Sequence, residues 1–161
     1  MSPRARAAAG SLVFLLVAPG VVAGVLPYLL TGWDRDGDVS TVAAVSGWLL
    51  VAAGLAVLLP AFARFVVEGI GTPAPVAPTE RLVVGGLYRF VRNPMYLAVA
   101  ALIVGQALVL GRPALLLYAA AFGVAVVAFV RGYEEPALAR RYGAEYDESR
   151  RAVPGWWPRL R

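Results

Sequence analysis

The sequence contains no cysteine and no histidine, and reading along it finds no lysine; each absence removes a class of chemistry. Without cysteine there is no disulfide, no thiolate nucleophile and no Cys-ligated zinc or iron–sulfur site. Without histidine there is no imidazole base and no histidine metal cluster. All 15 basic residues are arginine, which also excludes a lysine Schiff base. The polar residues that remain suit the binding of a reactive small molecule better than covalent catalysis, and no metal site is predicted.

Charge is also scarce. The 161 residues are 60% hydrophobic and only 16% charged, whereas about 25% of the residues in a soluble domain are charged. The apolar residues fall in long uncharged runs, which is typical of membrane proteins. The net charge of +5 comes from arginines that flank these runs, where they face anionic lipid headgroups. We therefore expect membrane lipids as partners and do not expect nucleic acid.

The uncharged runs predict an all-α integral membrane protein of one domain, residues 1–161, with about four transmembrane helices. The predicted spans are residues 7–31, 42–63, 95–111 and 113–130. The last two are separated only by Gly111-Arg112-Pro113, which predicts a tight antiparallel hairpin. Their shortness leaves open whether each crosses the bilayer fully.

Prolines and small residues suggest how the spans pack. Pro19 and Pro27 predict a kink in the first span, tolerated where neighbouring helices satisfy the freed carbonyls. Gly47 and Gly54, together with the alanine-rich third and fourth spans, allow close helix packing. Such a small-residue face would also permit a homodimer.

The arginines predict the orientation in the cell membrane. Thirteen of them lie before the first span, in the connector 64–94 or in the tail 131–161, and only Arg35 and Arg112 lie on the other side. Both termini, the connector and the tail are therefore predicted to be cytoplasmic. Within the tail, the apolar stripe of Leu138, Tyr142 and Tyr146 predicts an amphipathic helix over Glu134–Arg151.

Two polar clusters flank the predicted hairpin. The first, which includes Arg92, Asn93 and Tyr96, leads into the third span, and the second, Arg131-Gly-Tyr-Glu134-Glu135, leaves the fourth. A hairpin returns the chain to the side that it left, so the clusters should meet at one depth. Charges there mark a candidate functional site, but arginine and tyrosine are also ordinary interfacial anchors. The residues alone leave both interpretations open.

The motifs resemble those of a known superfamily. Gly-x-Tyr-x-x-x-Arg-Asn-Pro-Met-Tyr, a hairpin, then Glu-Glu-x-x-Leu-x-x-x-Tyr-Gly-x-x-Tyr and Val-Pro are similar to the isoprenylcysteine carboxyl methyltransferase and phospholipid methyltransferase superfamily. Those proteins are integral-membrane enzymes that use S-adenosylmethionine. The resemblance covers about residues 71–158 and joins both half-motifs in order. It implies methyl transfer from that cofactor to a membrane-embedded or hydrophobic acceptor.

The resemblance also implies roles for individual residues. The implied cofactor-binding residues are Glu80, Arg81, Leu82, Val83, Tyr88, Asn93, Pro94, Met95, Tyr96 and Glu134. The candidate catalytic residues are Arg92, Arg131 and Glu135, and Arg131 falls one residue from the arginine that binds the substrate carboxylate in the eukaryotic carboxyl methyltransferases. The family pattern commonly has histidine where this chain has Asn93, whose amide can donate and accept hydrogen bonds but cannot titrate.

Methyl transfer from a sulfonium needs neither a metal nor a covalent enzyme intermediate, so a chain without His, Cys or Lys can carry it out. Alignment of donor and acceptor can account for roughly 7–11 kcal/mol of the barrier. We expect Glu134 to pair with the cofactor ammonium, and Tyr88 and Tyr96 to offer ring faces to the sulfonium. Arg92 or Arg131 could hold a carboxylate or phosphate. The predicted pocket lies between spans three and four, roofed by the connector and the tail helix.

The sequence also bears on functions other than methyl transfer. A dinucleotide-dependent membrane reductase is disfavoured because the chain is short and lacks extra spans. A non-enzymatic accessory protein that keeps the fold is the alternative from another class. A channel or transporter is disfavoured because no ionisable residue lies inside the predicted spans, where Gln106 is the one polar residue beyond hydroxyls. The acceptor could be an isoprenylcysteine carboxylate, a phosphatidylethanolamine amine, a small thiol or a quinone-like lipid.

Overall fold

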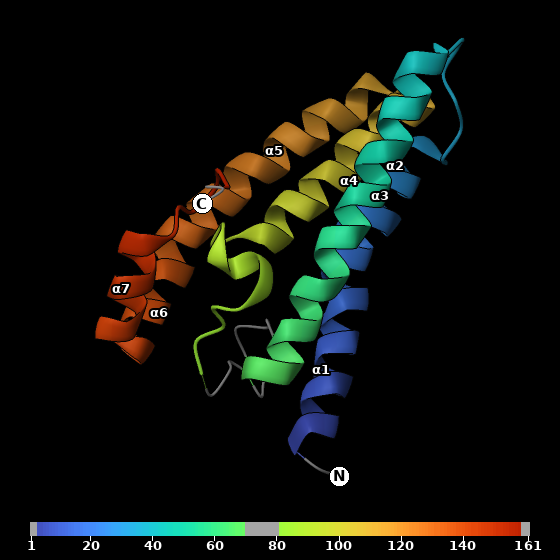
Figure 1. Cartoon of the computed structure of the whole chain (residues 1–161). Helices are drawn as coiled ribbons and strands as arrows, with labels where there is room; N and C mark the ends of the chain where they lie inside the picture. The colour runs from blue at the N-terminus through green and yellow to red at the C-terminus, as the bar shows by residue number, and fades with distance from the viewer. Residues whose placement is uncertain (1–2, 70–80, 159–161) are drawn as a thin grey trace.

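The computed structural model describes residues 3–69 and 81–158, and within these ranges all the regular structure is helical. Among the described residues, three apolar helices are long enough to cross a membrane: Ala8–Thr31, Thr41–Val67 and Pro113–Tyr142, of 24, 27 and 30 residues. The predicted third span is the 17-residue helix α4, Pro94–Leu110. These helices come together at the end that holds the turn between α4 and α5 (Pro113–Phe129), and they diverge towards the tail helices α6 (Glu135–Tyr142) and α7 (Ala144–Ala152) (Figure 1).

Helix α4 is the enclosed helix of the bundle. Its buried residues fall on every side: Pro94, Ala98, Val99, Leu102, Ile103, Gly105, Ala107, Val109 and Leu110. Helix α3 (Thr41–Arg64) packs against it most closely. A Cβ added to Gly47 would lie 2.6 Å from the carbonyl oxygen of Gly105, and a Cβ on Gly54 would lie 2.9 Å from Cγ of Leu102. The predicted role of Gly47 and Gly54 in close helix packing is confirmed.

The first apolar segment is interrupted where its prolines predict. Helix α1 (Pro3–Val17) is followed by a π-helical turn, Val21–Val25, and then by α2 (Leu26–Thr31). Pro27 has no N–H to offer the carbonyl of Ala23, and the N–H of Leu26 bonds to Val21 instead of Val22. Two carbonyls are thereby freed inside the bundle.

Side chains from two other helices satisfy these carbonyls. Gln106 of α4 donates from Nε2 to the Ala23 oxygen at 2.7 Å, and its Oε1 accepts from Nε1 of Trp33. Tyr118 of α5 (Pro113–Phe129) donates to the Val22 oxygen at 2.7 Å. The presence of Gln106 and Tyr118 in apolar helices is therefore explained by the carbonyls that the π-helical turn leaves unpaired.

The predicted hairpin between α4 and α5 is present. Gly111 ends α4 with φ of +65°, a left-handed conformation that glycine adopts without strain. The loop between α2 and α3 lies against this turn, since Asp36 N donates to the Leu110 oxygen and Arg112 Nε donates to the Asp34 oxygen. The two inter-helix connections at this end thus hold each other in place.

The tail differs from the single amphipathic helix that the sequence predicts. Helix α5 continues through a π-helical turn, Val130–Glu134, into α6 (Glu135–Tyr142), so that tail residues extend the membrane helix. The predicted helix then breaks at Gly143, with φ of +54°, and α7 (Ala144–Ala152) follows in another direction. The prediction of one helix was wrong because Gly143 adopts a backbone conformation that helices do not contain.

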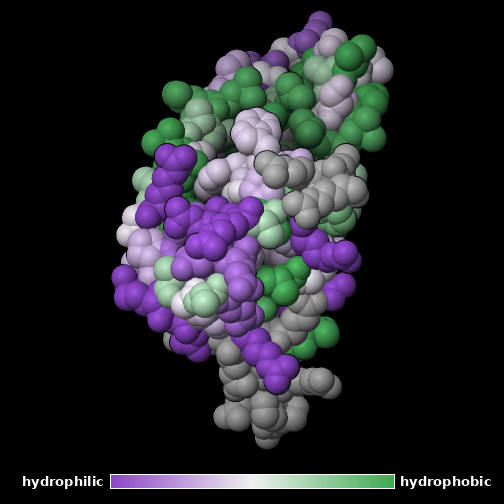
Figure 2. Space-filling view, turned by 60° about the vertical axis from the view of Figure 1, so that its left-hand side comes forward, coloured by the Kyte–Doolittle hydropathy of each residue, from purple (hydrophilic) through white to green (hydrophobic). Residues whose placement is uncertain are grey.

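Hydrophilic residues gather around the tail helices, and the surface above them is largely hydrophobic (Figure 2). The long apolar helices expose side chains such as Leu29, Val42, Leu49, Leu117 and Val124. Such a surface requires lipid around it. The chain is therefore a membrane protein, while the cytoplasmic location of both termini stays a prediction.

Candidate active site

The two polar clusters predicted to meet do lie together. The hydroxyl of Tyr96, in the first turn of α4, donates to Oε2 of Glu134 at 2.7 Å. Glu134 ends the π-helical turn after α5, so the hairpin brings both residues to one end of the bundle. Tyr96 is the one hydrogen-bond partner of this carboxylate within residues 3–69 and 81–158, and no ion pair with Glu134 occurs there. Its second oxygen can therefore accept from a cationic ligand.

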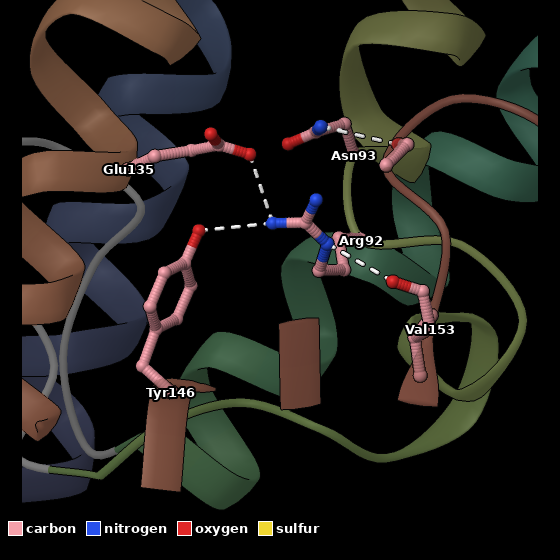
Figure 3. Close-up of polar contacts among 6 residues, drawn as sticks. Arg92, Asn93, Glu135, Tyr146 and Val153 are labelled. Atoms are coloured by element: carbon pink, nitrogen blue, oxygen red, sulfur yellow. Dashed lines mark hydrogen bonds and ion pairs between the residues drawn. The ribbon is translucent and has the colours of Figure 1, made fainter. Parts of the chain in front are cut away.

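Arg92 is the centre of the adjacent polar network (Figure 3). Its Nη1 forms an ion pair with Glu135 Oε1 at 2.9 Å and also donates to the hydroxyl of Tyr146 at 2.9 Å. Its Nε donates to the carbonyl of Val153 at 3.1 Å. One guanidinium thus joins the connector to α6, to α7 and to the segment after α7, as its planar array of donors allows.

The segment Val153–Trp156, here called the strap, runs across the start of α4. Backbone N–H groups of Arg92 and Asn93 donate to the carbonyls of Pro154 and Gly155, at 2.9 and 3.2 Å. The Asn93 side chain adds a bond from Nδ2 to the same Gly155 oxygen at 3.1 Å. The strap brings the ring of Trp156 to 6.4 Å from the ring of Tyr96, between centroids. Trp156 therefore lies beside Tyr96, the residue that bonds to Glu134.

Tyr88 lies in a short 3-10 helix of the connector, Gly86–Arg89, and is 8% exposed. Its ring packs with Ala61, Val83, Phe65 and Met95. Burial raises the pKa of the Tyr88 hydroxyl well above its ordinary value, and the negative charge of Glu134 adds to the rise. The hydroxyl has no hydrogen-bond partner in the described part of the chain. The ring of Tyr88 is therefore buried, while its unpartnered hydroxyl is a protonated donor that remains accessible.

A cavity of about 590 Å³ opens beside this site. It is lined by Val84, Tyr88, Arg89, Phe90, Glu145, Glu148, Ser149, Ala152, Val153 and Pro154. It thus lies between the connector and the α7–strap segment, where the break at Gly143 sets α7 apart as a separate wall. The pocket expected between spans three and four stays a prediction. Tyr88 lines this cavity, and the charge of Glu134 contributes to the raised pKa of its hydroxyl.

The other predicted site residues divide into two groups. Asn93 and Pro94 are buried, Val83 and Met95 pack with Tyr88, and Leu82 is half-buried beside them in sequence. Arg81 and Arg131 are exposed, and Arg131 makes no hydrogen bond or ion pair with the described residues. The structure therefore does not bring Arg131 into the cluster. Glu80 lies outside the described residues.

The sequence interpretation missed two residues of the site. Tyr146 was assigned only to an apolar stripe, and Trp156 only to the lipid interface. The sequence contains a signal for both, because Tyr146 is the last residue of the Glu-Glu-to-Tyr motif and Trp156 follows two residues after the Val-Pro sequence. Their contacts could not be predicted, since these depend on the break at Gly143. Among the described residues, no group of acidic side chains could hold a metal ion.

Comparison with known protein families supports one assignment. The family model for phospholipid methyltransferase matches residues 42–145, which is more than half of the chain. The match includes α3, the connector, the α4–α5 hairpin and α6, and therefore Arg92, Tyr96 and Glu134. No curated protein and no solved structure matches the chain significantly.

Proposed function

Because this chain belongs to the phospholipid methyltransferase family, one of the membrane methyltransferases, we propose that it transfers a methyl group from S-adenosylmethionine to a lipid-like or other hydrophobic acceptor. The observation that carries the proposal is the Tyr96–Glu134 hydrogen bond. This bond joins the two half-motifs at one point. The Glu134 carboxylate has no cationic partner among the described residues.

The residues around this carboxylate fit the proposed cofactor. The cofactor carries an ammonium and a sulfonium, and it supplies the electrophilic methyl group when bound. Glu134 would bind the ammonium through the oxygen that Tyr96 does not occupy. The rings of Tyr96 and Tyr88 would face the sulfonium, a contact that contributes about 0.5–2 kcal/mol each.

The protein's part in the reaction is to align and to exclude water. Tyr96 fixes the direction of the Glu134 carboxylate, and the strap covers the first turn of α4. Burial of Tyr88 among apolar side chains keeps its hydroxyl protonated, so it can donate to a ligand but cannot act as a base near neutral pH. An acceptor whose nucleophilic atom is already deprotonated, or loses its proton to solvent, suits this site best.

The acceptor is proposed to come from the membrane. The exposed apolar faces of α3 and α5 place lipid next to the bundle that holds the site. A carboxylate, an amine, a thiol or a quinone-like group on such a molecule could each accept the methyl group. A non-enzymatic accessory protein that keeps the fold is the second candidate, and cofactor binding distinguishes the two.

The test is calorimetric titration of S-adenosylmethionine into the purified chain in detergent. We expect binding by the wild type and strongly weakened binding by Glu134→Gln, which keeps the size of the side chain but removes its charge. Asp147→Asn is the control, because it removes an exposed carboxylate of α7 that does not line the cavity. Absence of binding by the wild type would refute the proposed function. If the wild type does bind, transfer of label from a radioactive methyl donor to an extracted membrane lipid identifies the acceptor.

A further inference from the structure

Most hydrogen-bond donors of Arg92 are already engaged within the protein. Its Nε donates to the Val153 carbonyl, and its Nη1 donates to Glu135 and Tyr146. Its backbone N–H donates to the Pro154 carbonyl. Both N–H-bearing groups of Asn93, main chain and side chain, converge on the oxygen of Gly155. Two consecutive residues of the recognised motif thus direct their bonds to the strap and the tail helices.

The strap passes close over these side chains. A Cβ added to Gly155 would lie 3.3 Å from Nη2 of Arg92 and 3.6 Å from Nδ2 of Asn93. Asn93 is 8% exposed, and the side chain of Arg92 is 17% exposed. Little space therefore remains for a ligand to reach either group while the strap is in place.

The two neighbouring tryptophans of the tail have different surroundings. The Trp156 ring lies beside Tyr96, whereas Trp157 is 85% exposed. Tryptophan is the aromatic residue that binds a cation most strongly, and Trp156 follows directly after the residue that Asn93 holds. The bonds from Arg92 and Asn93 therefore hold the three residues that precede Trp156.

From these contacts we propose that Arg92 and Asn93 are positioning residues, which hold the strap so that Trp156 forms one wall of the methyl-donor site beside Tyr96. This inference rests on the proposed function. It replaces the roles expected for these two residues, namely the binding of a carboxylate or phosphate by Arg92 and the cofactor contact that the resemblance implies for Asn93. Trp156, rather than Arg92, is then the group that touches the donor.

The test is a double-mutant cycle on S-adenosylmethionine binding by the full chain. Arg92→Lys keeps the charge that faces Glu135, but a single ammonium cannot also bond to Val153. We expect Arg92→Lys and Trp156→Ala each to raise the Kd at least about threefold, as loss of a cation–π contact would. In the Trp156→Ala background, Arg92→Lys should have no further effect, because the group that it positions is absent.

Matched controls are available for both variants. Arg112→Lys alters an arginine with the same two kinds of partner, a loop carbonyl and a carboxylate, at the other end of α4. Trp157→Ala removes the exposed tryptophan. Neither control should change the Kd. Equal donor affinity of the wild type and Arg92→Lys, or additive effects of the two changes, would overturn the positioning role while leaving the methyltransferase proposal intact. No binding by the wild type would overturn both.

Hydrogen–deuterium exchange supplies a measurement that does not depend on the donor. The amides of Arg92 and Asn93 are bonded to strap carbonyls, so their exchange reports whether the strap is in place. We expect these amides to exchange faster in Arg92→Lys than in the wild type or Arg112→Lys. Unchanged exchange would show that the strap is held without the Arg92 side chain, and the proposal would fail.

Discussion

Tyr96 and Glu134 stand 38 positions apart in the sequence, yet the hydroxyl of one lies 2.7 Å from a carboxylate oxygen of the other. The intervening chain is the helical hairpin of α4 and α5, and the π-helical turn after α5 carries Glu134. The hydrogen bond therefore depends on how α4 and α5 pack in the hairpin. Loss of this bond should change the rate of methyl transfer at the proposed site.

Substitution of Tyr96 by phenylalanine should lower kcat/KM for methyl transfer about tenfold. The reason is that a hydrogen bond to a charged group contributes about 1.5–3 kcal/mol, and the Glu134 carboxylate would lose the donor that orients it. Tyr133→Phe is the control, since Tyr133 is exposed and stacks on Phe129. Initial rates with a labelled methyl donor measure both variants. Equal rates for wild type and Tyr96→Phe would contradict the orienting role.

The Arg92–Glu135 ion pair should stabilise the tail. Both side chains are about four-fifths buried, so Glu135→Gln should lower the free energy of unfolding by about 1–2 kcal/mol. Asp36→Asn breaks the exposed pair with Arg112 and should cost less than about 1 kcal/mol. Thermal unfolding in one detergent ranks the two variants. A larger loss for Asp36→Asn would show that burial does not determine the worth of these pairs.

The sequence predicted the helices and the meeting of the two clusters because both follow from strong local signals. Uncharged runs require helices in lipid, and Gly111-Arg112-Pro113 leaves room only for a reversal. It did not predict the break at Gly143, because glycine is compatible both with a helix and with the conformation found there. The contacts of Tyr146 and the strap, and the position of the cavity, depend on that break and so could not be predicted either.

Gln106 should matter for stability rather than for catalysis. Gln106→Leu leaves the Ala23 carbonyl without its side-chain donor, and interhelical hydrogen bonds of this kind contribute about 0.6–2 kcal/mol. Tyr118→Phe removes the partner of Val22 and should have a similar effect. The midpoint of thermal unfolding should fall in both variants, while the Kd for S-adenosylmethionine stays unchanged. A midpoint equal to that of the wild type would refute the role of these side chains in satisfying the π-helical turn.

The contact between α3 and α4 should not tolerate a side chain at Gly105. A Cβ there would lie 2.7 Å from the Gly47 carbonyl oxygen and 2.8 Å from Val51 Cγ2, so the helices must separate. We expect Gly105→Ala to destabilise the protein by about 1–3 kcal/mol, as overpacking does. Gly123→Ala in α5 meets no atom within 4 Å and should be neutral or slightly stabilising. Thermal unfolding compares them, and a stabilised Gly105→Ala would contradict the close approach.

The burial of Tyr88 predicts a pH dependence of stability. Its pKa is raised in the folded protein, so the unfolded chain releases this proton first as the pH rises above about 10. The contribution of Tyr88 to the free energy of unfolding is fully present below that pH and decreases progressively as the pH rises further. The unfolding midpoint of the wild type should therefore fall between about pH 9.5 and 11, and Tyr88→Phe should fall less steeply. Parallel curves would show that Tyr88 ionises equally in both states.

The continuous helix from Pro113 to Tyr142 makes the thickness of the surrounding bilayer a variable of the reaction. Hydrophobic mismatch changes the tilt of a lipid-exposed helix, and Glu134 is carried by the extension of α5. Tyr96 belongs to the enclosed α4, which has few lipid contacts through which to follow. Reconstitution in phosphatidylcholines of increasing acyl-chain length should therefore reveal an optimum in turnover, at the length that lets the two residues keep their spacing.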